Sequence, residues 1–475
     1  MMNELKPYPA YKNSGVPWLG EVPEHWDIER AKRLFRKMDR VIQDSDEVVT
    51  CFRDGVVTLR KNRRVRGFTE SIKEIGYQGI RQGDLVIHAM DAFAGAIGVS
   101  DSDGKGTPVY SVCEPVSGVN SYFYAYMIRE MARNQWIQAL AKGIRERSTD
   151  FRFTDFGSQQ VPIPPLSEQA AIVRFIDHAE RRISRFIRTK LKLIKLLEEQ
   201  KQAIIHRAVT RGLDPNVRLK PSGVEWLGVV PEHWEVRRAK SVCSSIVDCK
   251  NRTPEAVDSG QYIVVRTTCI RKGKFDPDGG YKTNEKNYSI WTAKGAPCVG
   301  DVFFTREAPA GEACLVPDRD DLCMGQRMMF FRPNQDLLDP RFMLLNIYGP
   351  LTRTYIELET NGSTVGHLRL GQVNALPIIW CPLEEQKDII KHIDRETQSI
   401  IDTLAATQRE IALIREYRTR LIADVVTGKL DVREAAARLP VETVEPELVD
   451  EVESLCEGDE EVVDDLEAIT EEVDG

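Results

Sequence analysis

The hydrophobic pattern of this chain is dominated by two long stretches with a helical period. Across residues 166–213, apolar side chains recur at heptad spacing, and neither Pro nor Gly occurs between Leu166 and Arg211. The apolar positions are Ile172, Ile176, Ala179, Ile183, Phe186, Leu193, Leu197 and Ile204. A single helix cannot bury an apolar face of this length. We therefore predict a long helix that needs a partner.

Residues 383–430 supply that partner, because they repeat both the period and its flanking motifs 217 residues later. The sequence Pro-Leu-x-Glu-Gln opens the first stretch at 165–169 and the second at 382–386. At 1.5 Å per residue, helices of about 45 residues are roughly 65 Å long, and we expect them to pack antiparallel as a spacer. The alternative is two unrelated core helices, but these would rarely share matched flanking motifs.

A second duplication precedes each long helix. Residues 14–32 return at 222–240 with 14 of 19 positions identical, which indicates an internal repeat. Each copy contains two tryptophans, Trp18 and Trp26 or Trp226 and Trp234, among Gly and Pro residues that favour turns. We interpret these segments as docking pieces. His25 and His233 stand beside a Trp with no nucleophile or carboxylate cluster near them, so a structural role is favoured over a catalytic one.

The regions between these duplications mix strand and helix patterns. Residues 48–59 and 83–88 are predicted strands and 121–140 a helix; in the second copy, 261–267 and 300–305 are predicted strands and 340–355 a helix. The frames match, but the interiors diverge strongly. This indicates the same task performed on two different targets.

Charge is distributed unevenly along the chain. Residues 441–475 contain 16 Asp or Glu and no Lys or Arg, so residues 1–440 hold 65 basic and 57 acidic side chains, a balance of +8 against −8 for the whole chain. A basic body favours nucleic-acid binding only modestly, because a solvated surface has the same composition. The acidic tail is predicted to be disordered.

Other features exclude several classes of protein. The 475-residue length predicts more than one domain. No apolar run reaches membrane-spanning length and residues 1–11 lack a signal-peptide core, so a cytoplasmic protein is expected. The ten cysteines include no Cys-x-x-Cys pair, which predicts reduced structural thiols and no metal site.

Taken together and in order, the repeated motifs resemble the specificity subunit of type I restriction-modification enzymes. The resemblance covers residues 14 to about 432 and is carried by the paired Trp-Leu-Gly-x-Val-Pro-Glu-His-Trp openings, Gly-Asp at 83–84 and 300–301, and the Pro-Leu-x-Glu-Gln helix starts. It implies two target-recognition domains, each reading half of a split asymmetric DNA sequence. It also implies two modification subunits that carry S-adenosylmethionine and methylate adenine, and possible restriction subunits with Mg and ATP. The chain itself would hold no cofactor.

The predicted fold class is α+β, with two mixed α/β target-recognition domains joined by two long antiparallel coiled-coil helices as an internal pseudo-two-fold repeat. The expected segments are an N-terminal segment at 1–24, recognition domains at 25–165 and 214–381, spacer helices at 166–213 and 382–431, and an acidic tail at 432–475. Residues 1–11 are expected to be mobile.

Base readout would come from Arg, Asn, Gln, Ser and Thr in loops, and phosphate contacts from Lys and Arg. The candidate DNA-binding residues are Arg63, Arg64, Arg66, Lys142, Arg145, Arg147 and Ser148 in the first domain, and Lys250, Asn251, Arg252, Asn361, Ser363, Thr364, His367 and Arg369 in the second. The candidate partner-binding residues are Trp18, Trp26, Trp226, Trp234, Glu168, Gln169, Glu385 and Gln386.

Two competing functions have less support in the sequence. An enzyme that cuts or methylates DNA itself would need a nucleotide loop or an adenine-methylation motif, and neither occurs; Asp248-Cys249-Lys250 has the Asp-x-Lys form of some nucleases but no Pro-Asp partner upstream. A stand-alone repressor would also need two DNA-reading modules. It would not need the paired Trp segments, and it would bind its site tightly alone.

Overall fold

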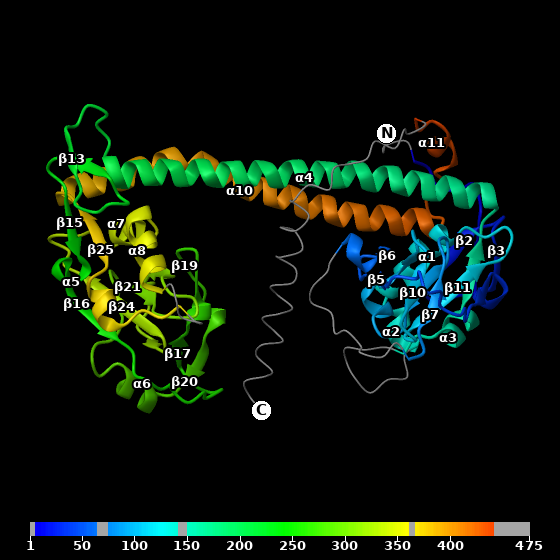
Figure 1. Ribbon diagram of the computed structural model, residues 1–475, viewed down its shortest axis with the longest axis horizontal. Coiled ribbons are helices and arrows are strands. Elements are labelled where there is room, and N and C mark those ends of the chain that lie inside the picture. The colour runs from blue at the N-terminus through cyan, green and yellow to red at the C-terminus, as the bar shows by residue number, and fades with distance from the viewer. Residues whose placement is uncertain (1–4, 64–74, 141–149, 361–365, 441–475) are drawn as a thin grey trace. The chain divides into compact units, whose positions relative to one another are not determined.

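The computed structural model describes residues 5–63, 75–140, 150–360 and 366–440, and its internal contacts divide the chain into two units. The first unit is Met1–Leu191 with Arg409–Gly475, and the second is Lys192–Gln408. Each unit combines helices with mainly antiparallel strands, labelled in Figure 1. The mixed α/β class predicted from the sequence is confirmed.

Short strands and helices build the first unit. Its strands are β1 (Tyr11–Asn13), β2 (Glu21–Pro23), β3 (Asp27–Arg30), β4 (Phe35–Lys37), β5 (Val49–Cys51), β6 (Val57–Leu59), β7 (Gln78–Ile80), β8 (Leu85–His88), β9 (Ile97–Val99), β10 (Gly104–Gly106), β11 (Tyr110–Pro115) and β12 (Gln160–Ile163). Its helices are η1 (Ala31–Arg33), η2 (Arg60–Asn62), η3 (Ala92–Ala94), α1 (Ser121–Arg133), α2 (Trp136–Leu140), α3 (Phe153–Ser158) and α11 (Arg433–Ala437), with the first part of α4 (Leu166–Arg211) and the last part of α10 (Leu383–Val426).

A four-stranded antiparallel sheet in the order β4-β11-β8-β9 supports the core of this unit. Helix α1 begins after Asn120, whose side chain accepts the backbone N–H groups of Tyr122 and Phe123. The helix buries Phe123 and Met127 completely in the same apolar cluster as β8 and the start of α4. The recognition module and the long helix therefore share one core.

The second unit contains the same frame with a larger insertion. Its strands are β13 (Leu219–Pro221), β14 (Val229–Pro231), β15 (Glu235–Arg238), β16 (Cys243–Asp248), β17 (Tyr262–Val265), β18 (Ile270–Arg271), β19 (Lys274–Phe275), β20 (Tyr281–Thr283), β21 (Val302–Thr305), β22 (Ala313–Leu315), β23 (Leu322–Met324), β24 (Met328–Pro333) and β25 (Pro377–Trp380). Its helices are α5 (Ala239–Val242), η4 (Thr267–Cys269), η5 (Pro277–Gly279), α6 (Glu285–Trp291), α7 (Pro340–Ile347), α8 (Pro350–Thr360) and α9 (Leu370–Asn374), with the remaining parts of α4 and α10.

The strand pairings reproduce the duplication seen in the sequence. The hairpin β1–β2 corresponds to β13–β14, the pair β3–β12 to β15–β25, and the sheet β4-β11-β8-β9 to β16-β24-β21-β22. The second unit adds the sheet β20-β17-β23, in which β17 and β23 are parallel. The prediction of matched frames with different interiors is confirmed.

Both long helices exist, and each ends earlier than predicted. Helix α4 stops at Arg211 and α10 at Val426, because Gly212 and Gly428 follow with positive φ angles of 71° and 80°. In the first unit the helices run antiparallel, since the 172–179 part of α4 shares a core with the 421–426 part of α10 while Lys190 Nζ lies 2.9 Å from Glu410 Oε2.

The buried seam of α4 drifts away from the predicted heptad. Ile172, Ile176, Ala179 and Ile183 are buried as expected, but Phe186 is 40% exposed and Ile187 is buried instead. Leu193 is also exposed. A straight helix has 3.6 residues per turn, so an ideal 3.5-residue count moves off the buried face after a few turns.

Several predicted boundaries were wrong. Residues 121–140 form two helices separated at Gln135, whose φ is 57°, and 340–355 are divided by Gly349 before Pro350 opens α8. Residues 48–59 form a hairpin and not one strand. The segment after residue 4 is packed and not mobile. Tyr8 is buried, and the backbone of Lys6 forms an isolated β-bridge with the backbone of Asp431.

The acidic tail also begins later than residue 432. Helix α11 follows Val432, and Val432, Ala436 and Leu439 are buried in the core of the first unit. Arg174 Nη2 donates to the carbonyl of Leu439 at 2.7 Å. The packed chain therefore continues at least to Pro440.

Candidate nucleic-acid interface

A buried carboxylate fixes the Trp segment to the start of the first long helix. Glu168, on the first turn of α4, is 3% exposed. It accepts hydrogen bonds from Tyr8 Oη at 2.6 Å and Trp26 Nε1 at 2.8 Å, and His25 Nε2 lies 2.8 Å from its second oxygen. Burial and the hydrogen bond to Glu168 raise the pKa of Tyr8 well above its usual range. This cluster anchors the Trp segment to α4. A structural role for His25 stays a prediction, which its contact with Glu168 supports.

The second unit repeats the anchor with fewer contacts. Glu385 accepts from Trp234 Nε1 at 3.1 Å, and His233 Nε2 lies 2.8 Å from its other oxygen. The position that corresponds to Tyr8 is Asn216, which is exposed. Glu385 is correspondingly more open, with 29% of its side chain exposed.

The glutamine beside each anchor ties the helix start to the recognition module. Gln169 accepts the backbone N–H of Asn120 at 2.9 Å and donates to the carbonyl of Pro164 at 2.8 Å. Gln386 accepts the N–H of Asp339 at 2.8 Å and donates to the carbonyl of Cys381 at 2.7 Å. Because residues 120 and 339 precede α1 and α7, each module is held at a set angle to its own long-helix start.

These contacts revise the predicted partner-binding residues. Trp26, Trp234, Glu168, Gln169 and Gln386 are buried by their own chain, so the prediction that they contact a partner directly was wrong; they stabilise each unit. Tryptophan residues with a hydrogen-bond partner for the indole N–H occur both in protein cores and at interfaces. The sequence pattern alone therefore does not distinguish the two locations. For Trp18, Glu385 and Trp226, which is 45% exposed, partner contact stays a prediction.

The Gly-Asp motif has a structural explanation that the sequence did not reveal. In each unit the Asp caps the turn before a central strand, accepting the N–H of Arg81 at 2.8 Å in the first unit and of Cys298 at 3.0 Å in the second. An arginine then neutralises it: Arg40 binds Asp84 with both Nη groups, and Arg332 binds Asp301 at 2.8 and 2.7 Å. The two arginines come from different elements, so no repeated spacing marks them.

The predicted DNA-binding residues divide into described and undescribed positions. Arg64, Arg66, Lys142, Arg145, Arg147, Ser148, Asn361, Ser363 and Thr364 lie outside the described residues. Arg63 pairs with Asp54 at 2.6 Å and stacks on Phe52. Its role in DNA binding stays a prediction.

In the second unit, Trp291 gathers two of the predicted cations. Lys250 Nζ lies 5.5 Å and the guanidinium carbon of Arg252 5.2 Å from the centre of its ring. Asn251 and Arg369 are exposed, and Arg369 is the residue directly before α9. A cation pair on this partly buried indole can contact phosphate.

His367 is the remaining predicted residue and belongs to a different group of loops. Its Nδ1 lies 3.1 Å from Glu307 Oε2, and the same carboxylate pairs with Arg327 Nε at 3.3 Å. Neither Glu307 nor Arg327 was predicted, because the three residues are far apart in the sequence.

The candidate catalytic groups among the described residues are paired or protonated. Asp248, of the Asp-x-Lys pattern, pairs with Arg306 at 3.0 Å. Burial raises the pKa of Cys243, Cys314 and Cys323 to about 12, so these thiols are protonated at neutral pH. Within the ranges that the structure describes, no group of His, Cys, Asp and Glu could hold a metal ion, and no helix is long and apolar enough to cross a membrane.

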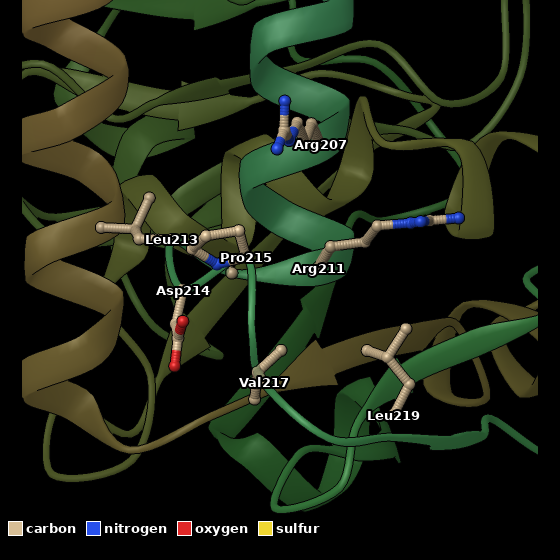
Figure 2. Close-up of a pocket in the computed structure, with 8 residues that line it drawn as sticks. Arg207, Arg211, Leu213, Asp214, Pro215, Val217 and Leu219 are labelled. Carbon is tan, nitrogen blue, oxygen red and sulfur yellow. The ribbon is translucent and has the colours of Figure 1, made fainter.

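One hollow of about 330 Å³ lies beside the C-terminal end of α4 in the second unit. Figure 2 shows Arg207 and Arg211 on successive turns of the helix, with Leu213, Val217 and Leu219 on the chain that leads into β13. These side chains are partly or fully exposed. The hollow contains none of the predicted site residues.

Comparison with known proteins finds specificity proteins of type I restriction systems. Residues 231–413 match the family model of the type I restriction modification DNA specificity domain. A Methanocaldococcus jannaschii protein provisionally named as the MjaX specificity subunit of a type I restriction enzyme is 21% identical over 438 residues, covering 87% of this chain and 96% of that protein. The type I restriction enzyme MjaVIII specificity subunit of the same organism is 22% identical over 326 residues, covering 66% and 70%.

A solved structure supports the fold. A chain described in work on complex assembly and conformational transition of the type I R-M system aligns with a TM-score of 0.60 at 17% identity, over 86% of this chain and 99% of that one. The matched model is that of a DNA specificity domain, and both named relatives are specificity subunits of type I restriction enzymes. The chain is similar to these specificity subunits over most of its length.

Proposed function

We propose that each unit reads one half of a bipartite, asymmetric DNA target, and that the chain thereby directs adenine methylation and restriction by partner subunits. The observation that carries this proposal is a repeated frame with different loops. The strand pairings and the Glu-Trp-His anchor recur in both units, while among the described residues the sheet β20-β17-β23 and the cations on Trp291 occur in the second unit alone. The two units would thus hold different DNA-binding surfaces on the same arrangement of strands, one surface for each half-site.

The continuous helices α4 and α10, of 46 and 44 residues, would set the gap between the half-sites. Helices of this length are roughly 65 to 70 Å long, about two turns of B-DNA at 34 to 36 Å each. Methylome sequencing of cells that express this chain with its modification subunit is the direct test. A split adenine-methylated motif that disappears on deletion of the chain is expected.

The half-site assignment has its own test. Replacing Arg63 by Ala should alter only one half of the motif, and replacing Lys250 and Arg252 together should alter only the other. Relaxation of both halves by either change would contradict the assignment. A gel shift with and without the modification subunit separates this function from that of a repressor, which would bind tightly alone.

Two modification subunits would dock on equivalent places of the long helices. Leu196 of α4 and Leu413 of α10 correspond to each other through the 217-residue repeat, and they are 62% and 65% exposed. Such large apolar exposure at matched positions of the two units favours two copies of one partner. These partners would supply S-adenosylmethionine, and restriction subunits would supply Mg and ATP; the complex would act in the cytoplasm.

Native mass spectrometry of the complex tests the docking positions. Leu196→Asp and Leu413→Asp should each remove one modification subunit, and the double variant should remove both. Leu358→Asp is the matched control, because Leu358 is 53% exposed but belongs to α8 and not to either long helix. Loss of both subunits from either single variant would contradict independent docking.

A further inference from the structure

Three segments of the second unit meet where its central sheet ends. The backbone N–H of Arg306, which follows β21, donates to the carbonyl of Arg327 before β24 at 2.9 Å. The N–H of Leu368 donates to the carbonyl of Arg306, also at 2.9 Å. The side chains of Glu307, Arg327 and His367 are thereby brought together.

The first unit makes the same junction from different side chains. Ala89 N donates to the carbonyl of Val109, and Phe151 N donates to the carbonyl of Ala89, both at 3.1 Å. The residues equivalent to Glu307, Arg327 and His367 are Met90, Val109 and Asp150. The backbone hydrogen bonds of this junction are the same in both units, whereas its side chains differ in charge and polarity. Two related modules that bind different DNA sequences would differ at such a place.

Within the junction, Glu307 holds the other two side chains. One of its oxygens pairs with Arg327 Nε at 3.3 Å and the other lies 3.1 Å from His367 Nδ1, and the carboxylate side chain is only 20% exposed. With Nε occupied, the two terminal Nη groups of Arg327 have no acceptor among the described residues. Arg327 is 50% exposed, so this end of the guanidinium fork is open to a ligand.

The backbone of Arg327 is also held in an unfavourable conformation. Its φ of 74° lies in the left-handed region, which a residue with a Cβ occupies at a cost in free energy and which Gly occupies freely. Stability alone would favour Gly at this position. A non-glycine residue in such a conformation is a candidate for a binding role.

We propose that Arg327 reads a guanine in the half-site of the second unit, donating from its Nη groups to O6 and N7, and that Glu307 positions the fork. An arginine fork on these two acceptors is the commonest base-specific contact in the major groove. The inference rests on the proposed function, since it names a reading residue in one of the two modules. His367 has a bracing role here and not a reading role.

The test is Arg327→Gly, assayed in the complex with the modification subunit on duplexes in which each base pair of both half-sites is replaced in turn. Discrimination at one G·C pair should fall by about 5- to 150-fold, with every other position unchanged. Thermal stability should be equal to or higher than that of the wild type, because Gly relieves the φ angle. Glu307→Gln should relax the same position by a smaller factor.

The control is Arg319→Ala. Arg319 is also an exposed arginine held by a carboxylate, with Nε 2.8 Å from Asp321 Oδ1, and its loss should leave discrimination unchanged. Arg327→Lys, which keeps the charge but not the fork, should behave like Arg327→Gly at the reading position. A uniform loss of methylation in Arg327→Gly would mean a phosphate contact and would overturn the proposal, as would unchanged discrimination at every position.

The wild-type complex distinguishes a failure of the proposed function from a failure of the role proposed for Arg327. If the wild-type complex methylates no split motif, the proposed function itself fails. If it methylates a split motif and Arg327→Gly retains full discrimination, only the role of Arg327 is refuted.

Discussion

The duplicated anchors allow a prediction in which one unit is the control for the other. Glu168→Ala removes a carboxylate that is 3% exposed and accepts from two buried donors, Tyr8 Oη and Trp26 Nε1, besides contacting His25. Hydrogen bonds to a charged group contribute about 1.5 to 3 kcal/mol each, and donors left buried without an acceptor cost about 1 to 3 kcal/mol. Because these contributions are not additive, we expect a local loss of about 4 kcal/mol in the first unit.

Glu385→Ala should cost much less. Its carboxylate has two neighbours, Trp234 and His233, and 29% of its side chain is open to water that can replace the lost contacts. A loss of about 1 to 2 kcal/mol in the second unit is expected. Tyr8→Phe removes the contact that Asn216 cannot make, so it should account for about 1 kcal/mol of the difference.

Peptide-resolved hydrogen exchange measures both effects, since a chain of two units has no single free energy of unfolding. In Glu168→Ala, protection of residues 5–34 should fall by roughly three orders of magnitude while that of 219–242 is unchanged. In Glu385→Ala, protection of 219–242 should fall roughly tenfold. Equal losses in the two variants, or a larger loss for Glu385→Ala, would refute the argument from burial and donor number.

Three further predictions concern the helices, the C-terminal segment and alkaline stability. Four residues inserted after both Lys190 and Thr407 should lengthen each helix by about 6 Å and lengthen the gap of the methylated motif by one or two base pairs; an unchanged gap would show that the helices do not set it. Truncation after Pro440 should leave the melting temperature unchanged, whereas truncation after Asp431 removes the buried Val432, Ala436 and Leu439 and should cost several kcal/mol, about 1 to 3 per large apolar side chain, in calorimetry. Burial raises the pKa of Tyr110 from 10 to about 12, so the protonated form stabilises the fold fully below pH 10, and this stability, about 3 kcal/mol, is lost as the pH rises from 10 to 12. Tyr110→Phe should flatten that part of the stability curve, and an identical slope would contradict the assignment.

The sequence predicted those features that repeat or have a period. Both long helices, the matched frames and the resemblance to type I specificity subunits followed from motifs that recur at 208 or 217 residues. The heptad count placed Phe186 on the buried face, where Ile187 lies, because an ideal heptad count ignores the drift of a straight helix. Helix ends were misplaced by a few residues because Gly212 and Gly428 were not weighed as stop signals.

What the sequence could not predict depends on burial and on segments that meet only in the fold. Glu168 and Trp26 were correctly singled out, but their residue types are equally suited to an exposed docking surface, and only burial distinguishes the two. Arg327 was not singled out at all. The observations that indicate a binding role for Arg327 are its positive φ angle and its grouping with Glu307 and His367, which lie 20 and 40 residues away in the sequence.

The closing of the first unit by residues from both ends of the chain has a consequence for synthesis on the ribosome. Tyr11 Oη donates to the carbonyl of Lys429, across a separation of 418 residues, and Gly428 lies so close to Trp26 that a Cβ there would be 2.8 Å from the indole. At 5 to 20 residues per second, the N-terminal segment waits about 20 to 80 s for these contacts. The second unit, Lys192–Gln408, is contiguous and needs no such delay. The module synthesised first is therefore the one completed last, and Trp26 lacks its contact with Gly428 throughout that interval.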